Sequence, residues 1–445
     1  MMSLFTFGSA LPISTITVAL PEIANDLGLS AKTLSWIPLI FLLASVILVL
    51  PCGRIADLYG RIRVFLTSIW FVIASATAIY FVQSDVALLA LRFCQGAGAA
   101  VGFVLLVSIV SSAVEKQSRG KAFGVVASAM YFGLTAGPLI GGYLVTHLSW
   151  RWTFLAHMPF MVAALFIGYR YVDSEWRIAK GERFDWQGSL AYAAGVVLVT
   201  TGVLTLPNYT STLAIVGGIM LLYGFVYLQR TSQHPLVNIN LFKHNRIFAY
   251  SCLTSIFMYA ANFSSLILVS LHLQYLRAMP ADTTGWVLMI SPLSTALVTP
   301  AAGIAADRFE PKYIVTIGIS LTALGLFLLC AIQTTTDIAM IVIAMVSLGV
   351  GFALFAPVNA HAIMASVGDT DIATAAAAHA SVRLIGQLVS MATVSLIFAI
   401  VIGQAQIAPE NYPRLADALK YCFLLAGVIC LPAYYYSLNR GRILS

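Results

Sequence analysis

Long apolar stretches separated by short polar segments dominate the pattern of this 445-residue chain. Cutting the apolar runs at charge clusters and at Pro, Gly and Asn turns predicts fourteen helices, all of them long enough to cross a bilayer, which takes roughly 17 to 25 residues. The predicted ranges are 3–23, 34–53, 63–82, 86–111, 122–146, 152–171, 188–206, 212–229, 247–271, 284–305, 313–332, 338–365, 373–403 and 418–437. The pattern therefore predicts an all-α integral membrane protein.

The composition leaves little room for anything besides these helices. Hydrophobic residues make up 60% of the chain and charged residues 9%, whereas soluble domains carry roughly 25% charged residues. No sizeable extramembrane domain is expected. The net charge of +7 is typical of the Lys and Arg excess in cytoplasmic loops, so no nucleic-acid partner is expected.

The basic residues also predict an orientation. An even number of spans puts both termini on one side, and the loops on that side hold seventeen Lys and Arg residues against five on the other. Since the Lys and Arg bias sets orientation, both termini are expected in the cytoplasm, with the protein a multi-pass component of the cell inner membrane.

An internal repeat divides the chain. Residues 53–61 read Gly-Arg-Ile-Ala-Asp-Leu-Tyr-Gly-Arg, and 250 residues later 303–308 read Gly-Ile-Ala-Ala-Asp-Arg. In a second repeat, Gly96 and Gly98 correspond to Gly349 and Gly351. These repeats predict two pseudo-symmetric six-helix bundles, an architecture in which transporters place their substrate site between the halves. The expected parts are residues 1–172, two inserted helices within 173–246, and residues 247–445.

Two glycine-containing motifs stand out. Residues 53–63 are expected to form a tight cytoplasmic link, in which Asp57 precedes Arg61 by four residues, the favourable order for a helical ion pair. A solvated loop is the alternative, but the recurrence at Asp307 favours a gating role. In the fifth helix, Gly133, Gly137 and Gly141 form a groove for another helix, Pro138 bends the backbone and Gly142 follows directly.

With these motifs, the chain resembles the fourteen-helix drug/proton antiporter family of the major facilitator superfamily over nearly its whole length. The matching segments are the link at 53–63, the fourth helix at 91–98 (Leu-Arg-Phe-Cys-Gln-Gly-Ala-Gly), the fifth at 133–142 and the external loop at 149–154. The resemblance implies the major facilitator fold and proton-coupled efflux of small amphipathic compounds by rocking of two bundles. It also implies a role in proton transfer for Arg92, with Gln95 one turn away.

This chain departs from that family at three positions. Pro12 stands where an acidic residue is common, Thr17 where an Asn is frequent, and His157 where an Asn usually begins the sixth helix. A carrier of one specific metabolite, not necessarily proton-coupled, is therefore the first alternative, and a non-transporting membrane receptor is a remote one. The sequence has no phosphate-binding Gly-Lys-Ser/Thr loop, catalytic cluster or Cys/His metal spacing, so neither an enzyme nor a cofactor is expected.

Charges inside the membrane point to the functional site. Arg92 and Arg383 fall within predicted spans, and such charges usually face a cavity or a partner. Because no acid lies clearly at mid-span, the site is expected to prefer neutral or anionic compounds over permanent cations. Glu22 is the first candidate for a carboxyl group that titrates during transport, against the alternative of a solvated loop acid.

Polar side chains on the predicted spans complete the expected cavity, although each could instead make a helix–helix hydrogen bond. They are Ser14, Thr17, Tyr131, Tyr259, Asn262, Asn359 and Gln387, together with Arg383. The expected partners are a small-molecule substrate, protons and the lipid bilayer, and a monomer is expected.

Overall fold

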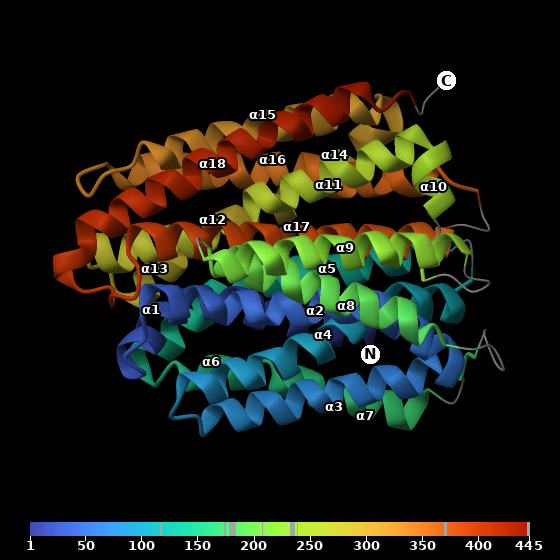
Figure 1. The fold of residues 1–445 in the computed structure, drawn as a ribbon, viewed down its shortest axis with the longest axis horizontal. Coiled ribbons are helices and arrows are strands. Elements are labelled where there is room, and N and C mark those ends of the chain that lie inside the picture. The colour runs from blue at the N-terminus through green and yellow to red at the C-terminus, as the bar shows by residue number, and fades with distance from the viewer. Residues whose placement is uncertain are drawn as a thin grey trace.

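A computed structural model describes residues 1–115, 118–172, 175–177, 184–206, 208–231, 236–237, 239–368 and 372–442. The helices run nearly side by side along the longest axis of the molecule (Figure 1). Within the described residues, fourteen segments are long and apolar enough to cross a membrane. The predicted number of spanning helices is therefore confirmed.

The first six spans form one group. They are α1 (Met2–Asp26), α2 (Ala31–Tyr59), α3 (Arg61–Tyr80), α4 (Asp85–Ala113), α5 (Arg119–His147), and α6 (Arg151–Leu155) with α7 (Met158–Tyr171). The sequence predicts an unbroken sixth helix, but the structure interrupts it at Ala156 and His157. Pro159 follows the break, and a proline has no backbone N–H to continue the helical ladder.

The last six spans form a second group. They are α11 (Arg246–Asn262) with α12 (Ser265–Leu271) and a π-helical turn at His272–Leu276, α13 (Ala281–Leu288) with α14 (Ile290–Arg308), α15 (Pro311–Cys330), α16 (Ile338–Ala365), α17 (Ile372–Val401) and α18 (Tyr412–Asn439). The short helix α10 (Ile239–His244) precedes them, and a single 3-10 turn at Pro409–Asn411 leads into α18.

Equivalent contacts recur in the two groups. In the first, the Ser45 hydroxyl of α2 donates to the carbonyl oxygen of Gly96 on α4 over 3.0 Å. In the second, the Thr295 hydroxyl of α14 donates to the carbonyl oxygen of Gly349 on α16, also over 3.0 Å. Glycine permits this closeness, because a Cβ at Gly96 or Gly349 would overlap the facing helix backbone. The two six-helix bundles are thus pseudo-symmetric in their packing.

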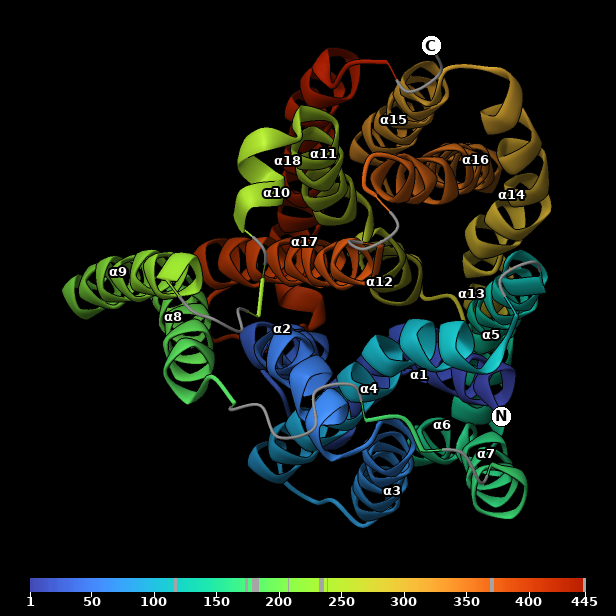
Figure 2. The ribbon, with the colours of Figure 1, turned by 90° about the vertical axis from the view of Figure 1, so that its right-hand side faces the viewer.

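Two further helices lie outside both bundles. Figure 2 shows α8 (Trp186–Leu204) and α9 (Tyr209–Thr231) as a hairpin beside α2 and α17. They pack closely on each other, since a Cβ at Gly218 would lie 2.9 Å from the Gly195 carbonyl oxygen. The Tyr192 hydroxyl donates to the carbonyl oxygen of Val46 over 3.0 Å and attaches the hairpin to α2.

The molecule has two distinct ends. The terminal end is where α1 begins and α18 finishes, and the opposite end carries the α1–α2 link and the α17–α18 link (Figures 1 and 2). At the opposite end, the Ala31 N–H donates to the carbonyl oxygen of Ala405 over 3.0 Å, and the Gln406 side chain donates to that of Gly28 over 2.9 Å. Deeper in, Gln274 donates to Val18 over 3.0 Å. Hydrogen bonds therefore join the bundles at the opposite end.

Candidate functional site

A cavity of about 200 Å³ lies between the two bundles. It is lined from both halves of the chain, by α1, α2, α4 and α5 on one side and by α11, α12, α14, α16 and α17 on the other. Eight of the residues singled out from the sequence line it: Ser14, Thr17, Arg92, Tyr131, Tyr259, Asn262, Arg383 and Gln387. Side chains far apart in sequence thus meet at one place.

Aromatic side chains form much of the remaining wall. Phe41 and Phe103 come from the first bundle, and Phe263 and Phe352 from the second. No Asp or Glu is among the described residues that line the cavity. The result is an apolar and aromatic pocket with a few polar groups, a composition typical of small-molecule sites, and its only full charges are positive.

Arg383 projects from α17 across the space between the bundles. Its guanidinium carbon lies 5.4 Å from the centre of the Phe103 ring on α4, a distance at which a cation and an aromatic face attract each other. Its Nε is buried without a hydrogen-bond partner, as is the side-chain oxygen of Asn262 nearby in the cavity wall. This arginine therefore retains hydrogen-bonding capacity on the cavity side.

Arg92 is held more tightly. Its Nε donates to the carbonyl oxygen of Ile37 over 3.3 Å and one terminal nitrogen donates to Gln95 Oε1 over 2.5 Å. The guanidinium carbon lies 4.6 Å from the ring centre of Phe41 and 5.7 Å from that of Phe154. The structure therefore brings Arg92 and Gln95 together, as their spacing predicts, with aromatic faces in place of a carboxylate.

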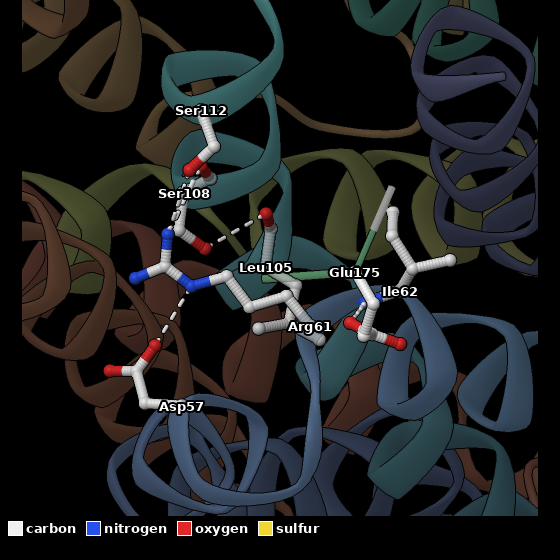
Figure 3. Close-up of polar contacts among 7 residues, drawn as sticks. All are labelled: Asp57, Arg61, Ile62, Leu105, Ser108, Ser112 and Glu175. Atoms are coloured by element: carbon white, nitrogen blue, oxygen red, sulfur yellow. Dashed lines mark hydrogen bonds and ion pairs between the residues drawn. The ribbon is translucent and has the colours of Figure 1, made fainter. Parts of the chain in front are cut away.

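At the terminal end, Asp57 and Arg61 also come together (Figure 3). Arg61 Nε donates to Asp57 Oδ1 over 2.8 Å, and another guanidinium nitrogen donates to the Ser112 hydroxyl over 3.0 Å. The expected link is shorter than the sequence suggests, because α2 continues as a helix through Tyr59 and Gly60 alone separates it from α3. The ion pair thus spans one residue of non-helical chain and connects α2 and α3 to α4.

Gly60 is required at this junction. Its φ of +117° lies in the region that side-chain-bearing residues avoid, and an added Cβ would lie 2.6 Å from the carboxyl carbon of Glu175. That carboxylate accepts from the N–H group of Ile62 over 3.0 Å (Figure 3) and from that of Arg63 over 3.1 Å, both in the first turn of α3. Glu175 is a helix cap that the sequence analysis missed, since it lies more than a hundred residues away.

The glycines of α5 face two partners. A Cβ at Gly133 would lie 2.6 Å from the carbonyl oxygen of Phe7, one at Gly141 would lie 2.8 Å from that of Thr15, and one at Gly137 would overlap the Ser14 hydroxyl. The predicted groove is thus filled by α1. Gly142 instead faces the second bundle, since a Cβ there would lie 2.6 Å from the Ala281 carbonyl oxygen. Pro138, within α5, packs its carbonyl group against Gly285 of α13.

One known protein family matches the sequence of this chain. A sequence model of the Major Facilitator Superfamily matches residues 2–278 and 251–442. The chain belongs to the Major Facilitator Superfamily. The family resemblance found in the sequence is therefore confirmed, and a transporter rather than an enzyme is the class to which the chain belongs.

Its relatives within the superfamily are transporters of different kinds. The chain is 25% identical to riboflavin transporter RibZ of Clostridioides difficile, over 81% of this chain and 79% of that protein. It is 27% identical to multidrug resistance protein Stp of Mycobacterium tuberculosis, over 86% and 72%. The xylose transporter XylE from E. coli, solved in a partially occluded inward open conformation, shares the fold at a TM-score of 0.64 and 14% identity, over 96% and 94%.

One expected cavity residue of this facilitator lies elsewhere. Asn359 is completely buried, and its side-chain nitrogen donates to the Ser251 carbonyl and to the Ser255 hydroxyl, each over 2.9 Å. Its oxygen accepts from Arg440 over 2.8 Å. Because the polar atoms of its side chain all form hydrogen bonds to α11 and to Arg440 at the end of α18, Asn359 is a packing residue at the terminal end.

Burial lowers the pKa of Arg440 to about 10, so its guanidinium is still charged at neutral pH.

The structure tests one of the two remaining candidate acids, Glu22. Glu22 is exposed near the opposite end of α1 and does not line the cavity. The side chain of Asp307 lies outside the described residues, so the second copy of the Asp57 arrangement stays a prediction.

Two contacts of this facilitator were not predicted from the sequence. Asp26 accepts from Trp150 Nε1 over 2.9 Å and from Arg151 over 2.8 Å, which connects the end of α1 to the start of α6. His157, at the break between α6 and α7, is completely buried near Arg92. Only its replacement of the usual Asn marked it in the sequence, and no spacing rule brings the fourth and sixth spans together.

Proposed function

We propose that this chain is a secondary active transporter that exports small amphipathic compounds in exchange for protons by alternating access. The observation that carries the proposal is the cavity between the two bundles, with an aromatic wall, a few polar groups and two arginines. An amphipathic solute presents an apolar body to Phe41, Phe103, Phe263 and Phe352 and a polar or anionic group to Arg383. The multidrug name of one relative supports a broad substrate range.

Movement of the bundles supplies the transport step in this proposal. The expected units are residues 1–172 and 247–445, with the helices of 173–246 between them. Hydrogen bonds join the units at the opposite end, which supports access to the cavity from the terminal end. The Asp57–Arg61 pair serves as a latch that engages in one state and releases in the other, and Gly137 and Pro138 shape the face of α5 that meets its neighbours.

The charge bias supports placing the terminal end in the cytoplasm of a cell whose inner membrane holds the protein. Substrate then enters from the cytoplasm or the inner leaflet and leaves at the opposite end. A single chain encloses the whole cavity, which supports a monomer as the functional unit.

A carrier of one specific metabolite is the second candidate. Two observations favour it: no carboxylate lines the cavity among the described residues, and one relative is named a riboflavin transporter. Counterflow in proteoliposomes separates either carrier from a receptor, because a receptor binds its ligand without moving it across the bilayer.

Proton movement in everted membrane vesicles tests the proposal. A pH-sensitive dye reports the proton gradient while riboflavin, which is neutral, fluorescein, which is anionic, or ethidium, which is a permanent cation, is added. We expect fluorescein or riboflavin to release protons from the vesicles, and Arg92→Ala to abolish the release. Counterflow of riboflavin without proton movement would favour the metabolite carrier, and absence of both signals for all three compounds would contradict the proposal.

A further inference from the structure

His157 is a buried titratable group without a partner. The residue is fully enclosed, and neither Nδ1 nor Nε2 has a hydrogen-bond partner. Buried polar side chains are nearly always hydrogen-bonded, so each exception calls for an explanation. The backbone is also irregular here, since α6 ends at Leu155 and α7 begins at Met158.

Arg92 is the charged neighbour of this imidazole. The guanidinium carbon of Arg92 lies 5.7 Å from the ring centre of Phe154, three residues before His157, and the guanidinium acts electrostatically on the imidazole. Arg92 also lines the cavity. Gln95, its hydrogen-bond partner, has a buried side-chain nitrogen that is itself unpaired. Arg92 thus connects an enclosed titratable group to the space in which a substrate binds.

The other helices packed against α6 and α7 are α1, α3 and α5, and their charged and titratable residues lie mostly towards the helix ends. On α1 these are Glu22 and Asp26, on α3 Arg61, Arg63 and Tyr80, on α5 Arg119, Lys121, Tyr131, Tyr143 and His147, and on α6 and α7 themselves Arg151, Tyr169, Arg170 and Tyr171. Asp26 is already paired with Arg151 and Arg61 with Asp57. Arg92 is therefore the charge that governs His157.

We propose that His157 is the residue that carries the proton in the transport cycle, with Arg92 as the group that controls its protonation. The inference rests on the proposed proton-coupled function and names its titrating group. Histidine suits the task because its imidazole changes charge near neutral pH. In the arrangement described here a proton on the ring would place a second positive charge near Arg92 in a buried site, which is unfavourable.

The cycle then follows from the position of Arg92. When the bundles move and Arg92 draws away from the ring, an imidazole nitrogen accepts one proton from water. When the present arrangement returns, the imidazolium gives that proton back to water, and the guanidinium keeps its charge throughout. A substrate that binds in the cavity lined by Arg92 favours the present arrangement, whereas the proton favours the other, as antiport requires.

The acids Glu22 and Asp57 are less suited to this role. Glu22 is exposed near the opposite end, and Asp57 is held in an ion pair near the terminal end. Neither lines the cavity or acts on a residue that does.

Hydrogen–deuterium exchange on the full-length protein in lipid nanodiscs tests the inference without a substrate. Peptides that contain Ala31 report the backbone hydrogen bond to Ala405 that closes the opposite end, since opening exposes that amide. Exchange is compared at about pH 6 and about pH 8, on either side of the ordinary imidazole range, with labelling times scaled to equal intrinsic exchange. We expect the wild-type uptake in these peptides to change about twofold or more between the two conditions.

His157→Gln should remove that pH response, and His157→Asn provides a second uncharged variant if the first folds poorly. His272→Gln is the matched control, because His272 is also buried with an unpaired ring nitrogen and should leave the response in place. An unchanged response in the His157 variants, an equal loss in the His272 variant, or a wild type indifferent to pH would each overturn the inference. The vesicle experiment separates the two proposals, because proton movement without the His157-dependent response would leave antiport standing and remove only this residue.

Discussion

The two arginines of the cavity differ in how they are held. Arg92 is engaged by Ile37, Gln95 and two aromatic rings, whereas the Nε of Arg383 is unpaired and its guanidinium rests on Phe103. A guanidinium with unused donors inside an apolar pocket is suited to bind an anionic group. We therefore expect Arg383 to determine which substrate charge the cavity prefers.

We predict that Arg383→Glu lowers fluorescein-dependent proton release by about tenfold or more. The variant replaces an attraction with a repulsion, and a hydrogen bond to a charged group is worth about 1.5–3 kcal/mol, where 1.4 kcal/mol corresponds to about tenfold. The measurement is the initial rate in everted vesicles at several fluorescein concentrations. Arg414→Glu, at an exposed position outside the cavity, is the control, and unchanged fluorescein transport in Arg383→Glu would contradict the reading.

Residue types and hydropathy predicted much of the cavity, with one clear failure. Tyr131, Tyr259 and Asn262 are polar residues within apolar spans, and they do line it. Asn359 fits the same description but bonds to Ser251 and Arg440. Sequence periodicity does not say at what depth, or toward which neighbour, a polar side chain points, because that depends on how helices from distant parts of the chain pack.

At the scale of helices, α1 and α5 pack very closely. The glycines of α5 let the α1 backbone approach so closely that side chains cannot be added without moving it. This pair lies within one bundle, so its closeness makes α1 and α5 move as a unit.

We predict that Gly137→Ala destabilises the protein, because its Cβ would overlap the Ser14 hydroxyl and lie 3.0 Å from the Leu11 carbonyl oxygen. Overpacking of this kind costs about 1–3 kcal/mol. Thermal unfolding of the purified protein should begin at lower temperature, with transport reduced in parallel. Gly124→Ala is the matched control on the same helix, since no atom lies within 4 Å of its added Cβ; equal midpoints for the two variants would refute the explanation.

The junction of α2 and α3 yields a prediction about rate rather than stability. Arg61→Gln removes the ion pair with Asp57 and weakens the contact with Ser112 on α4, so the latch no longer favours one state. We expect about a tenfold slower transport from the loss of roughly 1.5–3 kcal/mol, with little change in the amount of folded protein. Arg63→Gln is the control, because the Arg63 side chain is 74% exposed and 3.9 Å from Glu175. If the transport rates of Arg61→Gln and Arg63→Gln fall equally, the loss of one positive charge, and not the loss of the ion pair, would explain the decrease.

Helix ends were harder to predict than helices. The sequence treats Gly53 as the beginning of a link, since glycine commonly interrupts helices, but α2 continues to Tyr59. Gly53 lies inside this helix, and an added Cβ there would make only an ordinary contact with Val104 at 3.4 Å, so this glycine neither ends the helix nor marks a close approach. The cap from Glu175 was equally invisible, because it arrives from the segment that follows the sixth span.

For the molecule as a whole, the contacts at the opposite end test alternating access directly. Ser30 and Gln406 form an isolated antiparallel bridge between the two bundles, and paired residues of this kind are close enough for a disulfide. We predict that the double variant Ser30→Cys with Gln406→Cys loses transport on oxidation and regains it on reduction.

The single variants Ser30→Cys and Gln406→Cys control for the loss of the Ser30 cap on α2, which alone costs about 1 kcal/mol. Mass spectrometry of the linked peptides gives the extent of the bond. Full transport by a completely linked protein would show that the opposite end need not open, and would exclude rocking about the cavity.

The hairpin of α8 and α9 has a consequence for how the molecule sits among lipids. It contacts α2 and α17, one from each bundle, and is fixed to α2 by Tyr192, so it braces one seam between the halves. The other seam, where α5 meets α13 and α14, has no such brace among the described helices (Figure 2). If the bundles rock as proposed, their motion is asymmetric in the membrane plane. On one side α17 slides along α8, and on the other side the lipids next to α5 and α14 are displaced.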